Sequence, residues 1–240
     1  MQAAEVVGLA DVTSAEEKAC VESPTIVPWR ERIEGSIARS RKVRGGNFVQ
    51  IATVDHEGAP RCRTVVFRGF LKVAERGEAG EAMKFITDAR SEKVSQAAST
   101  GGKCEVCWWF SKSSEQYRVA GTLEFVGPEK SGGEPGSASE ELLAHRKQAW
   151  GNLSDNAREQ FYWGGQPGAA CGEAPPPDTL PPGGRDADGK VLPPPDTFFL
   201  VLLYPEQVKY LRLTDNFSQL DRKAAEGASG GEWSAVRVFP

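Results

Sequence analysis

The sequence contains no apolar run long enough to cross a membrane. Its longest run, Phe198 to Tyr204, has the length of a buried strand. The chain also has no excess of basic residues, because 29 Lys and Arg stand against 33 Asp and Glu, for a net charge of −4. No global positive field therefore attracts nucleic acid or an anionic membrane surface. We predict neither partner, and any anion site must be local.

Cysteine and histidine are scarce. Five scattered cysteines form no disulfide framework, and histidine occurs only at His56 and His145. Cys104 and Cys107 have the spacing of a metal motif, but they fall in a run predicted as a strand. Residues three apart on a strand point to opposite faces, so these two thiols cannot share one ion. We predict no metal site and expect both cysteines to be packing residues.

Several familiar signatures are absent: an internal repeat, a Walker loop, a GxGxxG loop and a GxSxG nucleophile motif. The first 23 residues are acidic and lack the layout of a secretory or transit peptide. We expect residues 1–25 to be a flexible N-terminal segment and residues 26–240 to form one domain. The expected location is cytoplasmic, with an organelle left open.

One β-hairpin organises the prediction. A β-rich run, Phe48–Val54, reaches a polar turn, and a second run leaves it from Pro60 to Leu71. The second arm carries Arg61, Arg63 and Arg68 beside apolar residues. Charges are costly to bury unless they are paired, so these arginines either meet an anion or protect a solvated edge strand from pairing with other chains.

A second informative stretch runs from Thr87 to Lys93, where a strand is predicted to end and a helix to begin. A helix N-terminus offers free N–H groups and a positive dipole end, and Ser91, Arg90 and Lys93 add a hydroxyl and two charges. This composition suits a phosphate site. Ordinary capping by Ser91 beside surface charges explains it equally well.

The rest of the chain predicts a mainly β protein. About seven strands are joined mostly by short turns, and they do not alternate with crossover helices, which disfavours a doubly wound parallel sheet. An antiparallel Greek-key or meander barrel with peripheral helices fits better. Besides the hairpin, the expected strands are Met83–Thr87, Cys104–Phe110, Glu115–Val126, Thr197–Tyr204, Gln207–Leu213 and Glu232–Phe239. Gly121 marks either a bulge or a close approach by a ligand or another backbone. The expected helices open at Pro28, Ser91, Ser139 and Ser154.

A segment at about 164–196 holds nine prolines and seven glycines in 33 residues. Such a segment supplies no packed core. It lies inside the domain, because strands that complete the sheet follow it. We expect an ordered excursion at best and disorder at worst.

Eight short motifs follow one another along the chain: Pro28-Trp29-Arg30, Gln50-Ile51-Ala52-Thr53-Val54, residues 63–70, residues 85–93, Trp108-Trp109-Phe110, residues 115–121, residues 153–158 and Trp233-Ser234. No single motif is specific, but the ordered set is. In this order the motifs resemble the pyridoxamine 5'-phosphate oxidase-like family of FMN-binding split barrels. The resemblance implies a split β-barrel of antiparallel Greek-key type, FMN as the cofactor, and a homodimer with the flavin at the subunit interface.

The resemblance also implies which residues bind FMN. Arg63, Lys93 and Ser91 would hold the phosphate, and Val65 and Phe67 would suit the flat ring. Gln116 would reach the flavin across the dimer interface. Arg63 and Arg68 leave a regular strand on opposite faces, so both can touch one FMN only if the strand twists or bulges, for example at Gly69. The complete implied set is Arg63, Thr64, Val65, Val66, Phe67, Arg68, Ile86, Thr87, Ser91, Lys93, Gln116 and Arg222.

The sequence departs from the vitamin-processing members of that family. Their Arg-x-His pair before the last FMN arginine is replaced by Ser218-Gln219-Leu220, and Arg68 stands where they carry Lys. The residues that hold substrate phosphate lack clear counterparts, the nearest being His145 and Arg146. We therefore expect an FMN-dependent oxidoreductase of an unspecified small molecule, with pyridoxamine or pyridoxine phosphate a minority prospect. A non-catalytic flavin carrier, sensor or interaction protein is the alternative.

Overall fold

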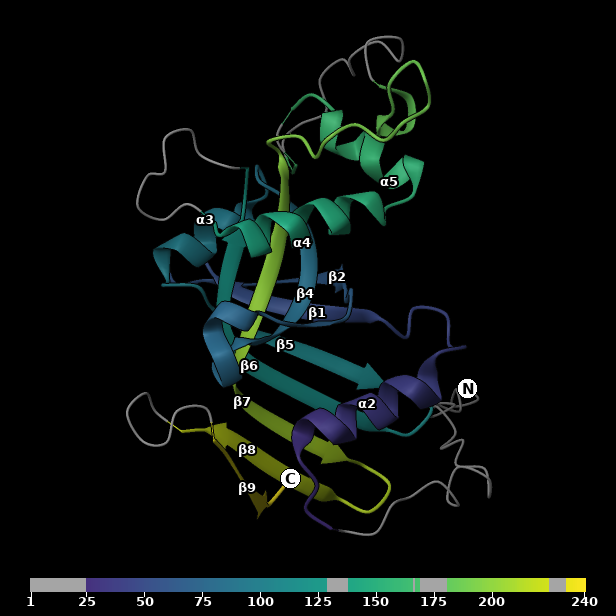
Figure 1. Cartoon of the computed structure of the whole chain (residues 1–240). Coiled ribbons are helices and arrows are strands. Elements are labelled where there is room, and N and C mark those ends of the chain that lie inside the picture. The colour runs from purple at the N-terminus through teal and green to yellow at the C-terminus, as the bar shows by residue number, and fades with distance from the viewer. Residues whose placement is uncertain (1–24, 129–137, 166, 169–180, 225–231) are drawn as a thin grey trace, which may run out of the picture.

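The computed structural model describes residues 25–128, 138–165, 167–168, 181–224 and 232–240 (Figure 1). The predicted flexible segment 1–25 therefore lies, except for Thr25, outside the described residues. The rest is built on one sheet in the order β2-β1-β5-β6-β7-β4-β3, with β8 on β7 and β9 on β8. Every strand pair is antiparallel, which confirms the predicted fold class. The strands are β1 Phe48–Val54, β2 Pro60–Val66, β3 Phe70–Lys72, β4 Glu81–Asp88, β5 Lys103–Phe110, β6 Glu115–Val126, β7 Phe198–Arg212, β8 Phe217–Lys223 and β9 Trp233–Val238.

The long strand β7 creates the split in the barrel. Its first part pairs with β4 and its second part with β8, while β6 runs along both. Pro205 lies between the two parts, and the register with β6 shifts between Ala120 and Gly121. A Cβ on Gly121 would stand 2.1 Å from the Tyr204 carbonyl oxygen, so only glycine fits there. The irregularity predicted at Gly121 is confirmed as a close approach by another backbone, beside a bulge whose extra residue is Glu206 of β7. The prediction of two separate strands around Pro205 was wrong, because the bulge absorbs the proline without ending the strand.

Strand β8 was missed by the sequence analysis because it is polar. Its buried face presents Gln219 and Asp221, which bond the start of helix α2 (Trp29–Ser40) instead of packing apolar surface. The Trp29 N–H donates to the Asp221 carboxylate at 3.2 Å, and the Gln219 amide donates to the Val27 carbonyl at 2.7 Å. A polar strand satisfied by a helix start has none of the alternation that marks an amphipathic strand.

The second arm of the hairpin ends at Val66, before the predicted Leu71. The chain then passes from β1 to β4: the Phe67 N–H donates to the Asn47 carbonyl, and the Arg68 N–H to the Lys84 carbonyl at 2.9 Å. Gly69 has φ +106°, a conformation that favours glycine. This corner interrupts the regular alternation between Arg63 and Arg68 that the sequence analysis identified as a difficulty.

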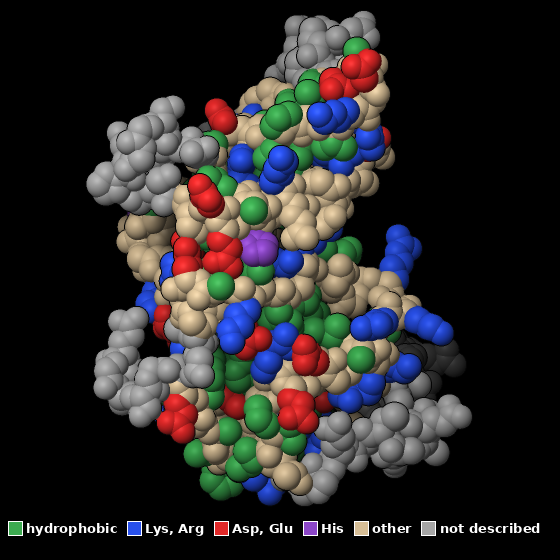
Figure 2. Space-filling model, viewed as in Figure 1, with side chains coloured by type: hydrophobic (Ala, Val, Ile, Leu, Met, Phe, Trp, Pro, Cys, Tyr) green, Lys and Arg blue, Asp and Glu red, His purple; other side chains and the backbone are tan. Residues whose placement is uncertain are grey.

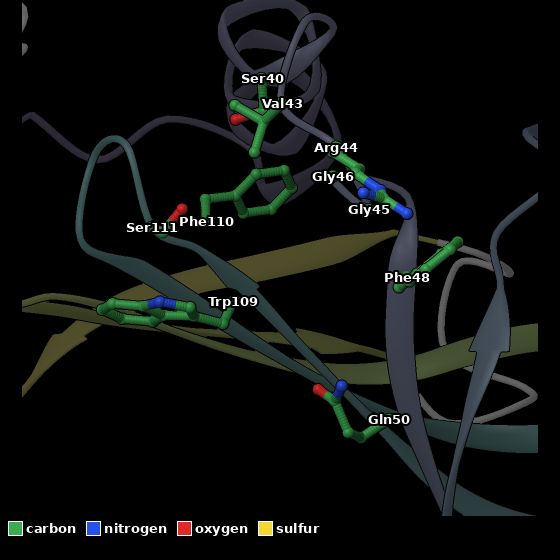
Figure 3. Close-up of a pocket in the computed structure, with 10 residues that line it drawn as sticks. All are labelled: Ser40, Val43, Arg44, Gly45, Gly46, Phe48, Gln50, Trp109, Phe110 and Ser111. Carbon is green, nitrogen blue, oxygen red and sulfur yellow. The ribbon is translucent and has the colours of Figure 1, made fainter.

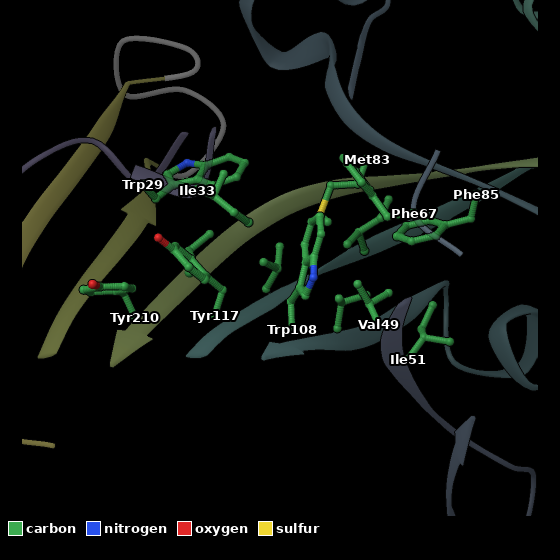
Figure 4. Close-up of a cluster of buried hydrophobic side chains, with 14 of the residues drawn as sticks. Trp29, Ile33, Val49, Ile51, Phe67, Met83, Phe85, Trp108, Tyr117 and Tyr210 are labelled. Carbon is green, nitrogen blue, oxygen red and sulfur yellow. The ribbon is translucent and has the colours of Figure 1, made fainter. Parts of the chain in front are cut away.

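The core fills the barrel and is rich in aromatic rings (Figure 4). Helix α2 covers one end, where Trp29 and Ile33 are buried, as their spacing predicts. Inside, Phe67 packs on Trp108 with ring centroids 4.7 Å apart, and Trp108 stacks on Phe110 at 4.9 Å. This packing fixes the inner faces of β1, β2 and β5.

Two helices and part of the proline-rich segment form a second packing unit. Helix α4 (Glu140–Gly151) and helix α5 (Asp155–Glu159) begin at Ser139 and Ser154, whose hydroxyls cap them as predicted. Residues 181–196 are ordered against them. The anchoring donors are Arg158 to Gly183 at 2.7 Å, Trp150 to Leu192 at 2.7 Å, and Arg146 to Pro195 at 2.7 Å.

Arg146 was one of the nearest polar candidates for holding a substrate phosphate. Its side chain is buried, and its guanidinium donates to the carbonyls of Phe198 and Pro195. Arg146 therefore anchors the proline-rich segment and is not available to a ligand.

Candidate functional site

Arg63 projects from the inner face of β2 onto two buried polar side chains. Its two terminal nitrogens donate to Thr53 Oγ1 at 2.7 Å and Gln96 Oε1 at 2.8 Å. Thr53 in turn donates to Gln96 at 2.6 Å, and both residues are buried. The guanidinium is thus held in place by neutral partners on β1 and on helix α3 (Glu92–Ser99).

Lys93 lies in the first turn of α3, directly after β4. Its ammonium group donates to Thr87 Oγ1 at 2.8 Å and to Ser91 Oγ at 2.6 Å. Ser91 occupies the N-cap position, but its side chain makes no capping hydrogen bond. The hydroxyl of Ser91 is therefore directed to the lysine, and simple capping does not explain this residue.

The two cations influence each other and have no carboxylate partner. Burial, and then the charge of Arg63, lowers the pKa of Lys93 to about 8. Burial also lowers the pKa of Arg63. Neither side chain takes part in an ion pair within the described part of the chain. Asp88, the acidic group that favours the charged form of Lys93, is itself paired with Arg90 at 2.6 Å.

A phosphate ester matches this donor set. It carries roughly −1.5 to −2 charge, and it would meet a guanidinium, an ammonium and two hydroxyls that can turn to donate. The N-terminal turn of α3 adds the positive end of its dipole. The hydrogen bonds that now hold Arg63 and Lys93 involve only neutral oxygens, so the site lacks a negative charge that such a ligand would supply.

The other residues predicted to bind FMN lie on both faces of their strands, and some of them belong to the core. Val65 is partly buried on the same face as Arg63. Phe67 is 8% exposed and belongs to the core. Its side chain is therefore not available to a flavin ring, although its backbone is. The exposed Thr64 and the partly buried Val66 point to the opposite face. The side chain of Ile86 lies on the face opposite to Thr87 and packs with the Trp150 cluster.

The last three residues of the predicted FMN set are Arg68, Gln116 and Arg222. None of them bonds Arg63 or Lys93 in the described structure. Arg68 is exposed, and its side chain makes no hydrogen bond or ion pair among the residues described. Gln116 on β6 and Arg222 on β8 project from the outer face of the sheet, where Arg222 donates to Gln207 at 3.1 Å. Within one protomer, the structure does not bring Gln116 and Arg222 to the cations.

Sequence reasoning missed Thr53 and Gln96, which hold Arg63. A weak signal existed for both. Thr53 continues the inward alternation of Val49 and Ile51, and Gln96 lies one helical turn after Lys93. A polar residue at an inward strand position, opposite a strand that carries arginines, indicates a partner for one of them.

The chain is similar to several known proteins. Residues 26–127 match the family model described as "Pyridoxamine 5'-phosphate oxidase, FMN-binding domain". Pyridoxine/pyridoxamine 5'-phosphate oxidase 2 of Arabidopsis thaliana is 29% identical over 216 residues, which cover 90% of this chain and 98% of that protein. A pyridoxamine 5'-phosphate oxidase-related, FMN-binding protein of Nostoc punctiforme is 30% identical, with a TM-score of 0.67, over 90% of this chain and all of that one. PhzG of Burkholderia lata, 17% identical with a TM-score of 0.62 over 97% of this chain and all of that one, shares the fold.

Fold and donor set together define an FMN-binding split barrel, and FMN is its cofactor. The chain belongs to the pyridoxamine 5'-phosphate oxidase-like family of FMN-binding proteins. Among the described residues, no helix is long and apolar enough to span a membrane.

Proposed function

We propose that this protein is an FMN-dependent oxidoreductase that acts on a small molecule as a homodimer. The observation that carries the proposal is the Arg63–Lys93 pair, two part-buried cations that only neutral oxygens contact. In the proposed complex both cations bind the FMN phosphate, with the hydroxyls of Thr87 and Ser91 beside them.

The remaining predicted residues would position the ring system. The strand that ends at Val66 leads from Arg63 toward Arg68, so the backbone of residues 64–67 and the side chain of Val65 would lie along the flavin. Arg68, whose side chain has no hydrogen-bond or ion-pair partner in the described structure, would supply a positive charge near the ring, and the Ile86 backbone would border it. When bound, FMN accepts or donates a hydride or single electrons, and the protein's part is to hold and orient it.

The outer face of the sheet supports the homodimer. Trp109, Gln116 and Leu211 are neighbours across β5, β6 and β7. On this face Trp109 is 43% exposed, and Val236 on β9 is 52% exposed. Apolar side chains exposed on a sheet face are typical of an interface between copies. A second copy there would bring Gln116 and Arg222 to the first copy's flavin and complete the predicted set.

The residues near the proposed substrate side argue against a vitamin-phosphate substrate. The similar Arabidopsis protein is named a pyridoxine/pyridoxamine 5'-phosphate oxidase. In this chain the Ser218 hydroxyl donates to the Tyr210 carbonyl at 2.9 Å, Gln219 is buried under α2, and Leu220 has no polar group. None of them offers a charge to a substrate phosphate, so we expect slow or absent turnover of that substrate.

Two measurements on the purified full-length protein test the proposal. The visible spectrum should show bound flavin, and denaturation should release FMN. An anaerobic substrate screen should then find small molecules that bleach the flavin. A colourless protein that takes up no FMN contradicts the proposal. Bound FMN that no substrate or reduced nicotinamide bleaches favours the alternative of a non-catalytic flavin carrier.

A further inference from the structure

A cavity of about 240 Å³ lies where the C-terminal end of α2 meets the ends of β1 and β5 (Figure 3). Its wall includes Trp109, which pairs with Gln116 of the proposed dimer interface. A second copy on that face would cover the cavity. The cavity therefore belongs to the proposed interface and marks no separate ligand site.

Ion pairs by themselves also mark no site in this protein. On the face shown in Figure 2, Asp and Glu side chains lie beside Lys and Arg side chains in several places. An exposed pair of this kind contributes little to stability and implies no ligand. The pair between Asp88 and Arg90 differs from these because it lies in the turn between β4 and α3, which carries Thr87, Ser91 and Lys93.

Arg90 occupies both carboxylate oxygens of Asp88. Its Nε donates to Oδ1 at 2.9 Å, its Nη2 donates to Oδ2 at 2.6 Å, and its backbone N–H donates to Oδ1 at 2.8 Å. A bidentate pair of this kind is among the strong hydrogen-bonded pairs in proteins. The side chains of Asp88 and Arg90 are 15% and 29% exposed, so solvent screens the pair only partly.

The remaining terminal nitrogen of the guanidinium fixes Arg90 in this position. Its Nη1 donates to the Trp163 carbonyl at 2.7 Å. The neighbouring Ala89 N–H donates to the Thr197 carbonyl, and the Thr197 hydroxyl donates to the Phe161 carbonyl, both at 2.7 Å. The chain before and after the proline-rich segment is thus fastened to the turn between β4 and α3. Arg90 would have to give up several hydrogen bonds to turn toward a phosphate.

The charges that act on Lys93 come from two sides. Burial lowers the pKa of Lys93, Arg63 on β2 lowers it further, and Asp88 raises it. Glu92, the other acidic residue of this turn, acts on Arg63 instead. In the described structure the Lys93 ammonium donates to two hydroxyls and not to Asp88, whose oxygens Arg90 holds. Loss of Arg90 would leave Asp88 free to pair with Lys93.

We propose that Arg90 is a positioning residue for the cofactor: by holding Asp88, it keeps Lys93 available to the FMN phosphate. A released carboxylate in this turn would compete with the phosphate for the ammonium group and would also repel the phosphate. This role rests on the proposed function, because it concerns the same phosphate site, and it falls to a residue outside the predicted FMN set. FMN binding should therefore weaken when Asp88 is released, although every proposed phosphate donor is still present.

The first measurement is the FMN dissociation constant of the full-length protein at pH 7, from flavin fluorescence titration. We expect about tenfold weaker binding in Arg90→Gln and binding at least as tight as wild type in Asp88→Asn. The double variant Arg90→Gln/Asp88→Asn should recover to within about threefold of wild type, because it has no carboxylate to release. The control is Arg61→Gln. Arg61 holds Asp55, which is not among the charges that act on Lys93.

The second measurement needs no flavin. The carbon-13 resonance of the Lys93 ε-carbon reports the pKa of Lys93 in the flavin-free protein. This pKa is about 8 in wild type and should rise by about one pH unit in Arg90→Gln, because a free carboxylate favours the charged lysine. It should return to 8 or below in the double variant. Arg61→Gln should leave it unchanged.

Three results would overturn the proposal: an unchanged Lys93 pKa in Arg90→Gln, no recovery of FMN binding in the double variant, or equal losses of binding in Arg90→Gln and Arg61→Gln. The second result would show that Arg90 itself binds the phosphate. If Arg90→Gln does not fold, Arg90→Lys takes its place in both measurements, since lysine keeps the charge and lacks the fork. Failure of the proposed function gives a different result: wild type binds no FMN, while the Lys93 pKa still decides whether Arg90 keeps Asp88 from the lysine.

Discussion

Two regions of the molecule hold buried or part-buried charged side chains. They differ in whether the protein itself supplies a partner of opposite charge. At the first, Glu115 is 2% exposed and accepts hydrogen bonds from Tyr210 at 2.7 Å, Ser36 at 2.8 Å, Arg39 at 3.1 Å and Ser113. At the second, Arg63 and Lys93 contact only neutral oxygens. In the first region a carboxylate is paired with a guanidinium, and in the second neither cation is paired with a carboxylate.

The pKa directions express the same difference. Burial alone would raise the pKa of Glu115, yet the hydroxyls of Ser113, Tyr210 and Ser36, together with Arg39, lower it. Burial lowers the pKa of Lys93, and the neighbouring Arg63 lowers it further. The fold therefore stabilises the charge of Glu115 and opposes the charge of Lys93. A charge that the fold opposes indicates a ligand.

The largest expected effect is a loss of folding stability when the Glu115 network is broken. Glu115→Ala would remove the buried acceptor that Arg39 and three hydroxyls share, and we expect the free energy of unfolding to fall by about 3–5 kcal/mol. Urea unfolding measures it. The control is Glu105→Ala, which breaks the exposed pair with Arg118 and should cost less than about 1 kcal/mol. Equal losses in the two variants would show that the Glu115 network is not special.

Removing one cation should instead affect the ligand. We expect Arg63→Ala or Lys93→Ala to weaken FMN binding about 30- to 150-fold, the worth of one charge-assisted hydrogen bond of about 2–3 kcal/mol. The stability of the flavin-free protein should change little, because Thr53 and Gln96 still bond each other. Flavin fluorescence titration measures the affinity. The control Arg61→Ala removes an arginine of the same strand that is already paired with Asp55.

The affinity for FMN should depend on pH through Lys93. Well below pH 8 the lysine is charged with or without ligand, so affinity should change little near pH 7 and begin to fall as the pH approaches 8. Above its flavin-free pKa of about 8, the lysine must take up a proton to bind, and affinity should fall by up to tenfold per pH unit. Titrations from pH 7 to 9.5 test this. Lys93→Arg should remove the dependence, and a flat wild-type profile would contradict it.

The smallest expected effect is a gain of stability in the flavin-free protein. Lys93 has a folded-state pKa of about 8 against 10.5 for an ordinary lysine, so its charge destabilises the folded state at neutral pH. Stability should rise as pH increases from 8 toward 10.5, because the unfolded chain keeps the proton that the folded chain loses. Lys93→Met should add about 1 kcal/mol at pH 7, after allowance for solvent screening. A loss of stability in Lys93→Met at pH 7 would mean that the charge of Lys93 stabilises the folded protein, which contradicts this prediction.

Much of the fold could be predicted because turns and alternation are local. The β1–β2 hairpin, the irregularity at Gly121 and the caps at Ser139 and Ser154 each follow from a few neighbouring residues. The predictions that failed concern features set by tertiary contacts. Strand β8 is polar because its partners come from α2. Strand β7 continues through Pro205 because it bulges there, with Glu206 as the extra residue opposite Ala120 and Gly121 of β6. No local pattern contains either fact.

The residues of the candidate site also divide into those that the sequence could predict and those that only the structure shows. Arg63, Ser91 and Lys93 stand out in the sequence as charge and hydroxyl where a strand or helix begins, and the structure brings them to one place. Phe67 looked suited to a flat ligand, but an apolar residue on the inner face serves the core equally well, and the core holds it. Thr53 and Gln96 could not be assigned, because only the packing of α3 on β1 shows which polar residue meets Arg63.

The central claim is that Arg63 and Lys93 recognise the phosphate of FMN, and the ratio of riboflavin to FMN dissociation constants tests it most directly. Riboflavin has the same ring and lacks the phosphate. In the wild-type protein FMN should bind several hundredfold more tightly, and in the Arg63→Ala/Lys93→Ala double variant the ratio should fall to near one while riboflavin affinity stays unchanged. A ratio that survives the double substitution would contradict the account.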